Sequence, residues 1–131
     1  MKKQSLFLLL FPIAAASCGG ADTAGSKTKA FIVGTYATGY TNEFNTTYDT
    51  VVVAPMAGSA EDMFTVINRT TIIYKEPDAT TPPQKSNRRQ WDGRFHADTH
   101  VLDGPDPGTS LSFDPDKGEA YIGNVTYKKL H

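Results

Sequence analysis

Residues 90–96, Gln-Trp-Asp-Gly-Arg-Phe-His, decide the fold class of this chain. Polar residues occupy every second position, and Trp91, Gly93 and Phe95 share the other side. Successive side chains of a β-strand point to opposite faces, so this period of two predicts a strand with one buried face. We therefore expect the indole of Trp91 to be buried.

The pattern of short β-type segments continues on both sides of this strand. Runs of β-branched and aromatic residues, separated by turn-forming residues, lie at residues 31–36, 48–53, 63–67, 70–74, 101–102, 110–113 and 120–130. Such runs predict strands, and no stretch of ten or more residues has the apolar spacing of a helix. The sequence thus predicts an all-β antiparallel meander of seven to eight strands, curled or closed into a small barrel, with a two-sheet sandwich as the alternative.

Composition narrows the classes of partner. The chain has 13 Lys and Arg against 14 Asp and Glu, which leaves no basic excess for a nucleic acid. It also has six Tyr, seven Phe and one Trp, and of these only Phe7 and Phe11 precede the single cysteine. A narrow barrel filled by so many rings has little room for a large ligand.

The first 18 residues have the order of a secretory signal peptide. Lys2 and Lys3 are followed by an apolar run at residues 6–13, by small residues and by Cys18. The run is too short to span a membrane permanently. Residues 15–18, Ala-Ala-Ser-Cys, resemble the lipobox of bacterial lipoproteins, with Ala at the position where Leu is commonest.

This resemblance implies a location. In bacterial lipoproteins the cysteine is acylated and the peptide is cut before it, so membrane contact is expected through acyl chains, such as palmitate, on Cys18. Gly19 rather than Asp follows the cysteine, which by analogy favours the outer membrane of the cell envelope. Residues 22–24, Asp-Thr-Ala, also resemble the acceptor sequence of some bacterial O-glycosylation systems, which makes Thr23 a candidate for modification.

We therefore divide the chain into three parts. Residues 1–17 are the predicted signal peptide, and residues 18–29 are the predicted acylated cysteine and a flexible tether rich in Gly, Ser and Thr. Residues 30–131 are predicted to form a single β domain. Beyond the lipobox, this organisation resembles that of small, uncharacterised β-rich envelope lipoproteins.

A second resemblance concerns the first strand. Residues 33–36, Val-Gly-Thr-Tyr, are similar to the Gly-x-Trp opening of lipocalin-like barrels, with Tyr in place of Trp. The last strand has Lys128 and Lys129 where that family places Arg. The resemblance implies a small lipocalin-like barrel and, as an alternative function, a carrier of a small apolar ligand.

Two segments contain groups that can bind metals. Residues 114–119 place Asp114, Asp116 and Glu119 around Gly118, and residues 96–100 contain His96, Asp98 and His100. A calcium loop needs more oxygen ligands, and a zinc site needs three or four converging ligands. We interpret both segments as polar turns and expect no metal and no cofactor.

The sequence also lacks the pattern of a nucleophilic enzyme. No serine lies in a Gly-x-Ser-x-Gly elbow, and lipidation uses the one cysteine. No pair of carboxylates is marked out for glycoside hydrolysis. We therefore predict that the protein is not an enzyme, with a hydrolase as the third hypothesis.

The strongest candidate for a contact surface is the proline-rich stretch 77–87, followed by Arg88 and Arg89. Long loops on β scaffolds often bind partners, and arginines beside Trp91 have the composition of a protein or glycan contact. We predict Arg88, Arg89 and Trp91 as binding residues. The sequence thus favours a membrane-anchored envelope lipoprotein that acts as a non-catalytic binding or accessory module for an envelope protein or a glycan.

Overall fold

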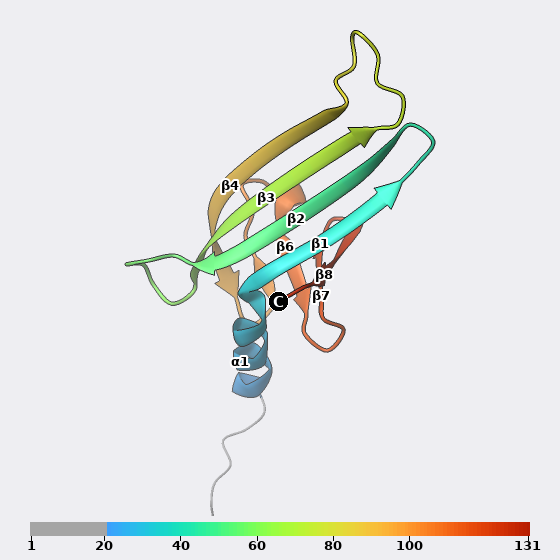
Figure 1. The fold of residues 1–131 in the computed structure, drawn as a ribbon. Helices are drawn as coiled ribbons and strands as arrows, with labels where there is room; N and C mark the ends of the chain where they lie inside the picture. Colours follow the sequence, from blue (N-terminus) through green and yellow to red (C-terminus); the bar gives the residue numbers. More distant parts are fainter. Residues whose placement is uncertain (1–20) are drawn as a thin grey trace, which may run out of the picture.

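The structure, a computed structural model, describes the backbone of residues 21–131 and the side chains of residues 27–131. Its elements in chain order are α1 (Ala21–Ile32), β1 (Gly34–Thr41), β2 (Asn45–Pro55), β3 (Met63–Tyr74), β4 (Gln84–His96), β5 (Val101–Leu102), η1 (Pro107–Thr109), β6 (Leu111–Asp114), β7 (Glu119–Ile122) and β8 (Val125–Lys129). The eight strands pair antiparallel in chain order, and β8 returns to β1 to close a barrel (Figure 1). The predicted all-β meander is confirmed, in the form of a closed barrel.

The strands of this barrel differ greatly in length. Strands β2, β3 and β4 have 11, 12 and 13 residues, whereas β5 has two residues and β8 has five. β1 pairs with β8 only at Tyr36 and Ala37, and β4 pairs with β5 only at Phe95 and His96. The far parts of β1–β4 therefore continue beyond the barrel as a four-stranded overhanging sheet, formed by residues 38–41, 45–49, 68–74 and 84–90 (Figure 1).

The chemistry of the inward-facing positions changes where the barrel ends. Within the barrel these positions are apolar, and their buried side chains include Tyr36, Val51, Val53, Phe64, Val66, Trp91 and Phe95. Two residues further along the same strands, the same face presents Asp49, Asn68 and Arg89. Burying apolar surface drives strand closure, and polar side chains give no such gain. The barrel accordingly ends where the inward residues become polar.

Aromatic side chains fill the barrel. Neighbouring rings of Phe31, Tyr36, Phe113, Phe95 and Phe64 meet edge to face, with centroids 5.7–6.4 Å apart. Such edge contacts are favourable beyond the area that the rings bury. The expected burial of Trp91 is confirmed, because its side chain is only 9% exposed.

Helix α1 lies against the end of the barrel opposite the overhanging sheet (Figure 1). The side chains of Thr28 and Ile32 are buried there. The hydroxyl of Tyr36 lies 2.9 Å from the carbonyl oxygens of Phe31 and Ile32, so the first strand holds the last turn of the helix. Lys129 of β8 donates to the Phe31 carbonyl, and its Nζ lies 4.4 Å from the centre of the Phe31 ring.

The junction between α1 and β1 requires glycine. Gly34 has φ +147°, and a Cβ at this position would collide with the carbonyl oxygen of His131. The chain terminus passes close to Gly34 because Thr35 N donates to His131 O at 2.7 Å and Leu130 N donates to Thr35 O at 2.8 Å. A side chain at Gly34 would therefore separate the two ends of the domain.

The helix corrects two predicted boundaries. The tether was expected to reach Lys29 and the first strand to begin at Phe31, whereas α1 covers Ala21–Ile32 and β1 begins at Gly34. The helix has no clear apolar stripe in the sequence, and its last turns are held by tertiary contacts of Ile32 with the barrel. Cys18 and the signal-peptide prediction lie outside the described residues.

The position of the long loop is also corrected. The proline-rich break was expected to run through Asn87, but β4 begins at Gln84, and Tyr74 N donates to Pro83 O at 3.1 Å. Residues 84–87 are exposed and polar, and they pair with β3 because the register of β4 places them opposite the β-branched residues 70–73. The loop between β3 and β4 therefore covers only residues 75–83.

Candidate functional site: the overhanging sheet

The three residues that the sequence predicted as binding residues all lie on β4, but on different faces. Trp91 points into the barrel, and the guanidinium carbon of Arg89 lies 5.7 Å from the centre of its ring. Arg88 points to the outer face, where its Nη2 donates to Gln90 Oε1 at 2.7 Å. The structure therefore brings Arg89 and Trp91 together and places Arg88 on the opposite side of the sheet. Their role in binding stays a prediction.

Trp91 has an unusual environment for a buried indole. Its Nε1 is buried and has no hydrogen-bond partner among the described residues. Leaving a buried N–H unpaired costs roughly 1–3 kcal/mol. Trp91 therefore combines a large apolar contribution to the core with one polar group that the core does not satisfy.

Asp49 organises a polar cluster at the boundary between the barrel and the overhanging sheet. Its Oδ1 accepts hydrogen bonds from Asn68 Nδ2 at 2.6 Å and from Thr70 Oγ1 at 3.0 Å. Its Oδ2 accepts a hydrogen bond from the Tyr127 hydroxyl at 2.5 Å. Donors from two other strands, β3 and β8, thus satisfy one half-buried carboxylate of β2. This cluster was not predicted from the sequence, although an Asp two residues before the inward-facing Val51 was a usable signal.

The cluster also changes the acid–base chemistry of Tyr127. Burial, followed by the hydrogen bond to Asp49 and the negative charge of that carboxylate, raises the pKa of the Tyr127 phenol above its ordinary value. The phenol is therefore a hydrogen-bond donor at neutral pH and orients the Asp49 carboxylate. The inward face of the overhanging sheet consequently begins with a fixed acceptor.

A shallow hollow lies further along this inward face. It has a volume of about 380 Å³ and is lined by Thr70, Ile72, Lys85, Ser86 and Asn87. Of these, Lys85, Ser86 and Asn87 are exposed. The hollow offers an ammonium, an amide and a hydroxyl beside one aliphatic side chain, a combination that suits a polar or anionic partner.

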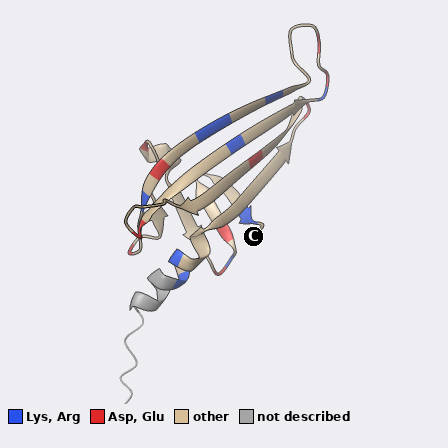
Figure 2. Ribbon diagram, turned by 60° about the vertical axis from the view of Figure 1, so that its left-hand side comes forward, with Lys and Arg blue, Asp and Glu red and all other residues tan. Residues whose placement is uncertain are grey.

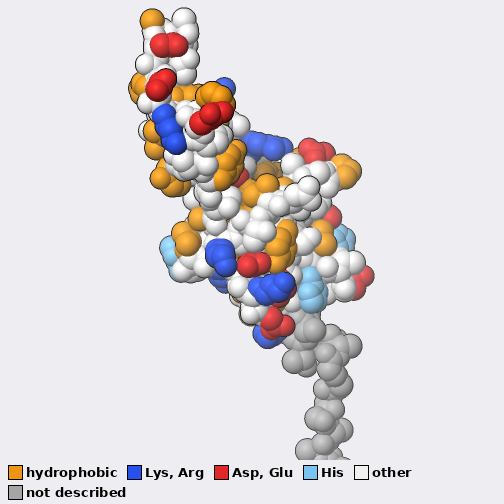
Figure 3. All heavy atoms as spheres, turned by 90° about the vertical axis from the view of Figure 1, so that its right-hand side faces the viewer, with side chains coloured by type: hydrophobic (Ala, Val, Ile, Leu, Met, Phe, Trp, Pro, Cys, Tyr) orange, Lys and Arg blue, Asp and Glu red, His pale blue; other side chains and the backbone are white. Residues whose placement is uncertain are grey.

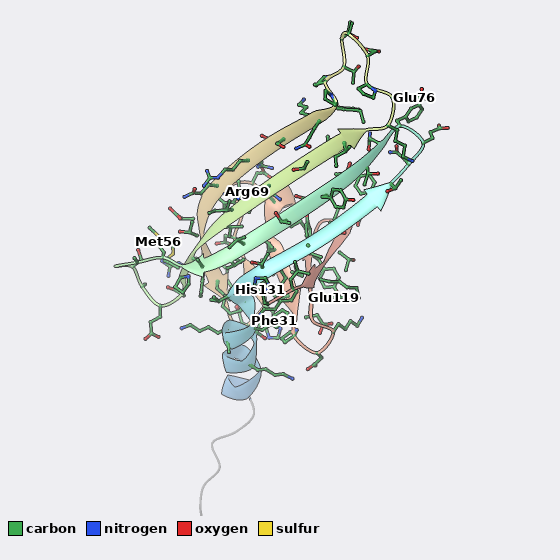
Figure 4. The ribbon with its side chains drawn as sticks, in the orientation of Figure 1. Phe31, Met56, Arg69, Glu76, Glu119 and His131 are labelled. Atoms are coloured by element: carbon green, nitrogen blue, oxygen red, sulfur yellow. The ribbon has the colours of Figure 1, made fainter. Side chains whose placement is uncertain are left out.

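The far end of the overhanging sheet carries exposed rings. Tyr40 is 60% exposed and Phe44 is 69% exposed, and apolar and acidic side chains lie together at this end (Figure 3). Phe44 and Tyr74 line a second hollow, of about 270 Å³, together with Glu43, Glu76 and Thr81. The label of Glu76 in Figure 4 marks this end, which lies far from Phe31 and α1.

The loop at this end has a defined turn. Asp78 Oδ1 accepts hydrogen bonds from Thr80 Oγ1, from Thr80 N and from Thr81 N, at 2.7–2.8 Å. These bonds, that from the Thr80 hydroxyl first, lower the pKa of the Asp78 carboxyl. An aspartate that bonds the backbone two and three residues later stabilises a turn. The loop is therefore held in a preferred conformation by its own residues.

The two segments with metal-binding groups form polar turns. Asp114 Oδ1 accepts from the backbone N of Asp116 at 3.1 Å, and Asp116 pairs with Lys27 of α1. His96 Nε2 lies 2.8 Å from Asp103 Oδ2, whereas His100, with φ +58°, lines a different hollow next to α1. Across the part of the chain that the structure describes, no group of three or more His, Cys, Asp or Glu is arranged to hold a metal.

Comparison with known proteins gives no relative for this chain. No protein-family model matches it, and neither the curated proteins nor the solved structures contain a match. Within residues 21–131, no helix has both the length and the apolar character needed to cross a membrane. The functional proposal therefore rests on the fold and on the surface chemistry described above.

Proposed function

We propose that this protein is a membrane-anchored lipoprotein of the bacterial envelope that acts as a non-catalytic binding or accessory module for an envelope protein or a glycan. Lipidation of Cys18 provides the anchor, and the outer membrane is the proposed location. The overhanging sheet provides the contact surface. Neither a metal nor a cofactor takes part.

The observation that carries this proposal is the four-stranded sheet that continues past the end of the barrel. A sheet normally buries at least one face against a core. Here the inward face beyond the barrel is lined by polar groups, with Asp49, Asn87 and Arg89 among them, and both faces of β3 and β4 remain partly exposed. An extended, uncovered and hydrogen-bonded surface of this kind suits a partner of large area.

The barrel interior supports the choice of a module over a lipocalin-like carrier. A carrier needs an open apolar cavity, commonly of about 300 Å³ or more. The edge-to-face rings of Tyr36, Phe95 and Phe113 occupy the interior instead. The hollow of about 380 Å³ has an ammonium and an amide in its lining and lies on the overhanging sheet.

The position of α1 supports an orientation relative to the membrane. The helix begins at Ala21, three residues after Cys18 in the sequence, and the far end of the overhanging sheet lies at the opposite end of the domain (Figure 1). The 13 residues of β4 span roughly 40 Å at about 3.3 Å per residue. An acylated Cys18 would therefore leave the contact surface projecting away from the lipid.

Site-specific photo-crosslinking in cells that produce the full chain tests this proposal. A photoreactive phenylalanine analogue is placed at Asn87, which is exposed on the overhanging sheet, or at Thr126, which is exposed on β8. We expect the position at Asn87 to form crosslinks to an envelope protein or a glycan, and the matched position at Thr126 to form none. Equal crosslinking from both positions, or none from Asn87, would contradict the proposal.

A further inference from the structure

Strand β4 has a long edge without a neighbouring strand. It pairs with β3 from Gln84 to Arg94, but on its other side β5 reaches only Phe95 and His96. One further bond, from Asp103 N to Arg94 O at 3.0 Å, ends the ladder on that side. The nine residues from 84 to 92 therefore form an open edge of roughly 30 Å.

The pairing pattern tells which backbone groups face outward from this edge. In an antiparallel pair, residues bond alternately to one neighbour and to the other. Tyr74 N bonds to Pro83 O and Phe95 N bonds to Asp62 O, so the odd-numbered residues of β4 bond to β3. The bond from Asp103 to Arg94 shows that the even-numbered residues face the β5 side. The residues with outward backbone groups are Gln84, Ser86, Arg88, Gln90 and Asp92.

These outward N–H and C=O groups have no backbone partner among the described residues. An exposed row of this kind is a template for pairing with another chain, and proteins usually shorten, twist or cover such edges. Adding an extended peptide to an open edge is a common mode of recognition, in which the backbone gives affinity and the side chains give specificity. The length of the β4 edge fits a peptide of about nine residues.

The side chains around the edge select the charge of the added strand. Arg69 and Arg88 lie directly opposite each other in the pairing of β3 and β4, and both are exposed on the outer face. Like charges in this position repel each other, so an anion between them would relieve the repulsion. Lys85 and Arg89 add two positive charges on the other face of the same strand, and basic residues are visible along β4 in Figure 2.

The same charges argue against a second copy of this chain as the occupant. Pairing the β4 edge with itself would bring Arg88 and its basic neighbours against one another. The negative charge at the barrel end of the edge belongs to Asp92, whose Oδ1 already accepts a hydrogen bond from Thr65 Oγ1 at 2.7 Å. The open edge is therefore basic over residues 84–90, which complements an acidic strand.

We propose that the β4 edge binds an extended acidic segment of a partner protein, which adds to the sheet as a ninth strand. This inference rests on the proposed function as a binding module and names the partner class and the docking mode. Backbone pairing would use the outward groups of Ser86, Arg88 and Gln90. Carboxylates of the segment would lie between Arg69 and Arg88 on one face and beside Arg89 on the other.

Amide hydrogen exchange with a defined probe tests this inference. The probe is an acetylated nine-residue peptide that alternates glutamate with threonine and valine, added at about 1 mM to the isotope-labelled full chain in detergent micelles. We expect exchange of the amides of Ser86, Arg88 and Gln90 to slow by about tenfold or more. The amides of Asn87 and Arg89, which already bond to β3, should change little. A peptide methylated on alternate backbone nitrogens, and one with lysine in place of glutamate, serve as controls and should have no effect.

Two pairs of variants separate backbone pairing from charge. Gln90→Pro removes one outward N–H without touching a bond to β3, and Gln90→Ala is its control. Arg88→Glu reverses the charge, and Arg88→Lys keeps it. We expect the first member of each pair to lose the effect of the peptide and the second to retain it, and Arg88→Glu remains informative if Gln90→Pro fails to fold.

Three results would overturn the inference: no slowing with the acidic peptide, equal slowing with the lysine peptide, or an unchanged effect in both Gln90→Pro and Arg88→Glu. The proposed function fails separately, through absent crosslinks from Asn87 in cells. Crosslinks from Asn87 without protection by the peptide would keep the binding module and reject the added strand.

Discussion

Replacing Trp91 by alanine tests how the core and the overhanging sheet are joined. The side chain is 9% exposed and lies in the core cluster, and truncating a buried Trp to Ala typically costs about 3–5 kcal/mol. Its unpaired Nε1 already carries a penalty of roughly 1–3 kcal/mol, which the alanine removes. We therefore expect a loss near the lower end, about 3 kcal/mol, out of a total stability on the order of 5–15 kcal/mol.

A matched substitution isolates the contribution of the N–H group. Trp91→Phe keeps an aromatic ring and also removes the unpaired donor, so its cost should stay below about 1.5 kcal/mol. Thermal unfolding followed by circular dichroism should show a melting temperature lower by on the order of 10–15 °C for Trp91→Ala and a much smaller shift for Trp91→Phe. An unchanged melting temperature in Trp91→Ala would refute the burial and would make the ring a surface residue available for binding.

Three further predictions concern the anchor, the polar cluster and the loop. Cys18→Ser should abolish palmitate labelling and release the protein from the membrane fraction, and a variant that stays membrane-bound would contradict the lipid anchor. Burial, and after it the hydrogen bond to Asp49, raises the pKa of the Tyr127 phenol in the folded protein. The protonated phenol therefore contributes its full stabilisation below about pH 10, and this stabilisation is lost as the pH rises through the raised pKa. In urea unfolding, the free energy of unfolding of Tyr127→Phe should therefore fall less above about pH 10 than that of the wild type. Burial also raises the pKa of Tyr36, so both proteins should still lose some stability at alkaline pH. Identical pH profiles of the two proteins would exclude a contribution of the Tyr127 phenol. Exchanging residues 75–83 for a Gly/Ser connector of half the length should change the free energy of unfolding through loop closure by only about 0.6 kcal/mol, and a collapse of the fold would show that the loop is part of the core.

Local alternation made the fold class predictable. The positions of Trp91 and Phe95 in a period of two identify the inward face of β4, and the β-branched runs around them identify the other strands. The helix was not predictable in this way, because its stability comes from the contacts of Ile32 and Thr28 with the barrel and not from an apolar stripe of its own.

The overhanging sheet depends on strand pairing over long sequence distances. Asp49, Asn68 and Arg89 each lie in separate strands, and only the register places them on one inward face. The opposite orientation of Arg88 and Arg89 could be predicted from the sequence, because adjacent residues of a strand point to opposite faces. The open edge of β4 could not be predicted, because it results from the short length of β5 relative to β4.

Amide exchange of the full chain without any ligand tests whether the sheet extends beyond the barrel with an open edge along β4. We expect an alternating pattern along β4. The amides of Lys85, Asn87, Arg89 and Trp91, which bond to β3, should exchange slowly, and those of Ser86, Arg88, Gln90 and Asp92 should exchange quickly. Uniformly slow exchange over residues 85–92 would show that the edge is covered, and uniformly fast exchange would show that β4 does not pair with β3 beyond the barrel; either result would contradict this arrangement.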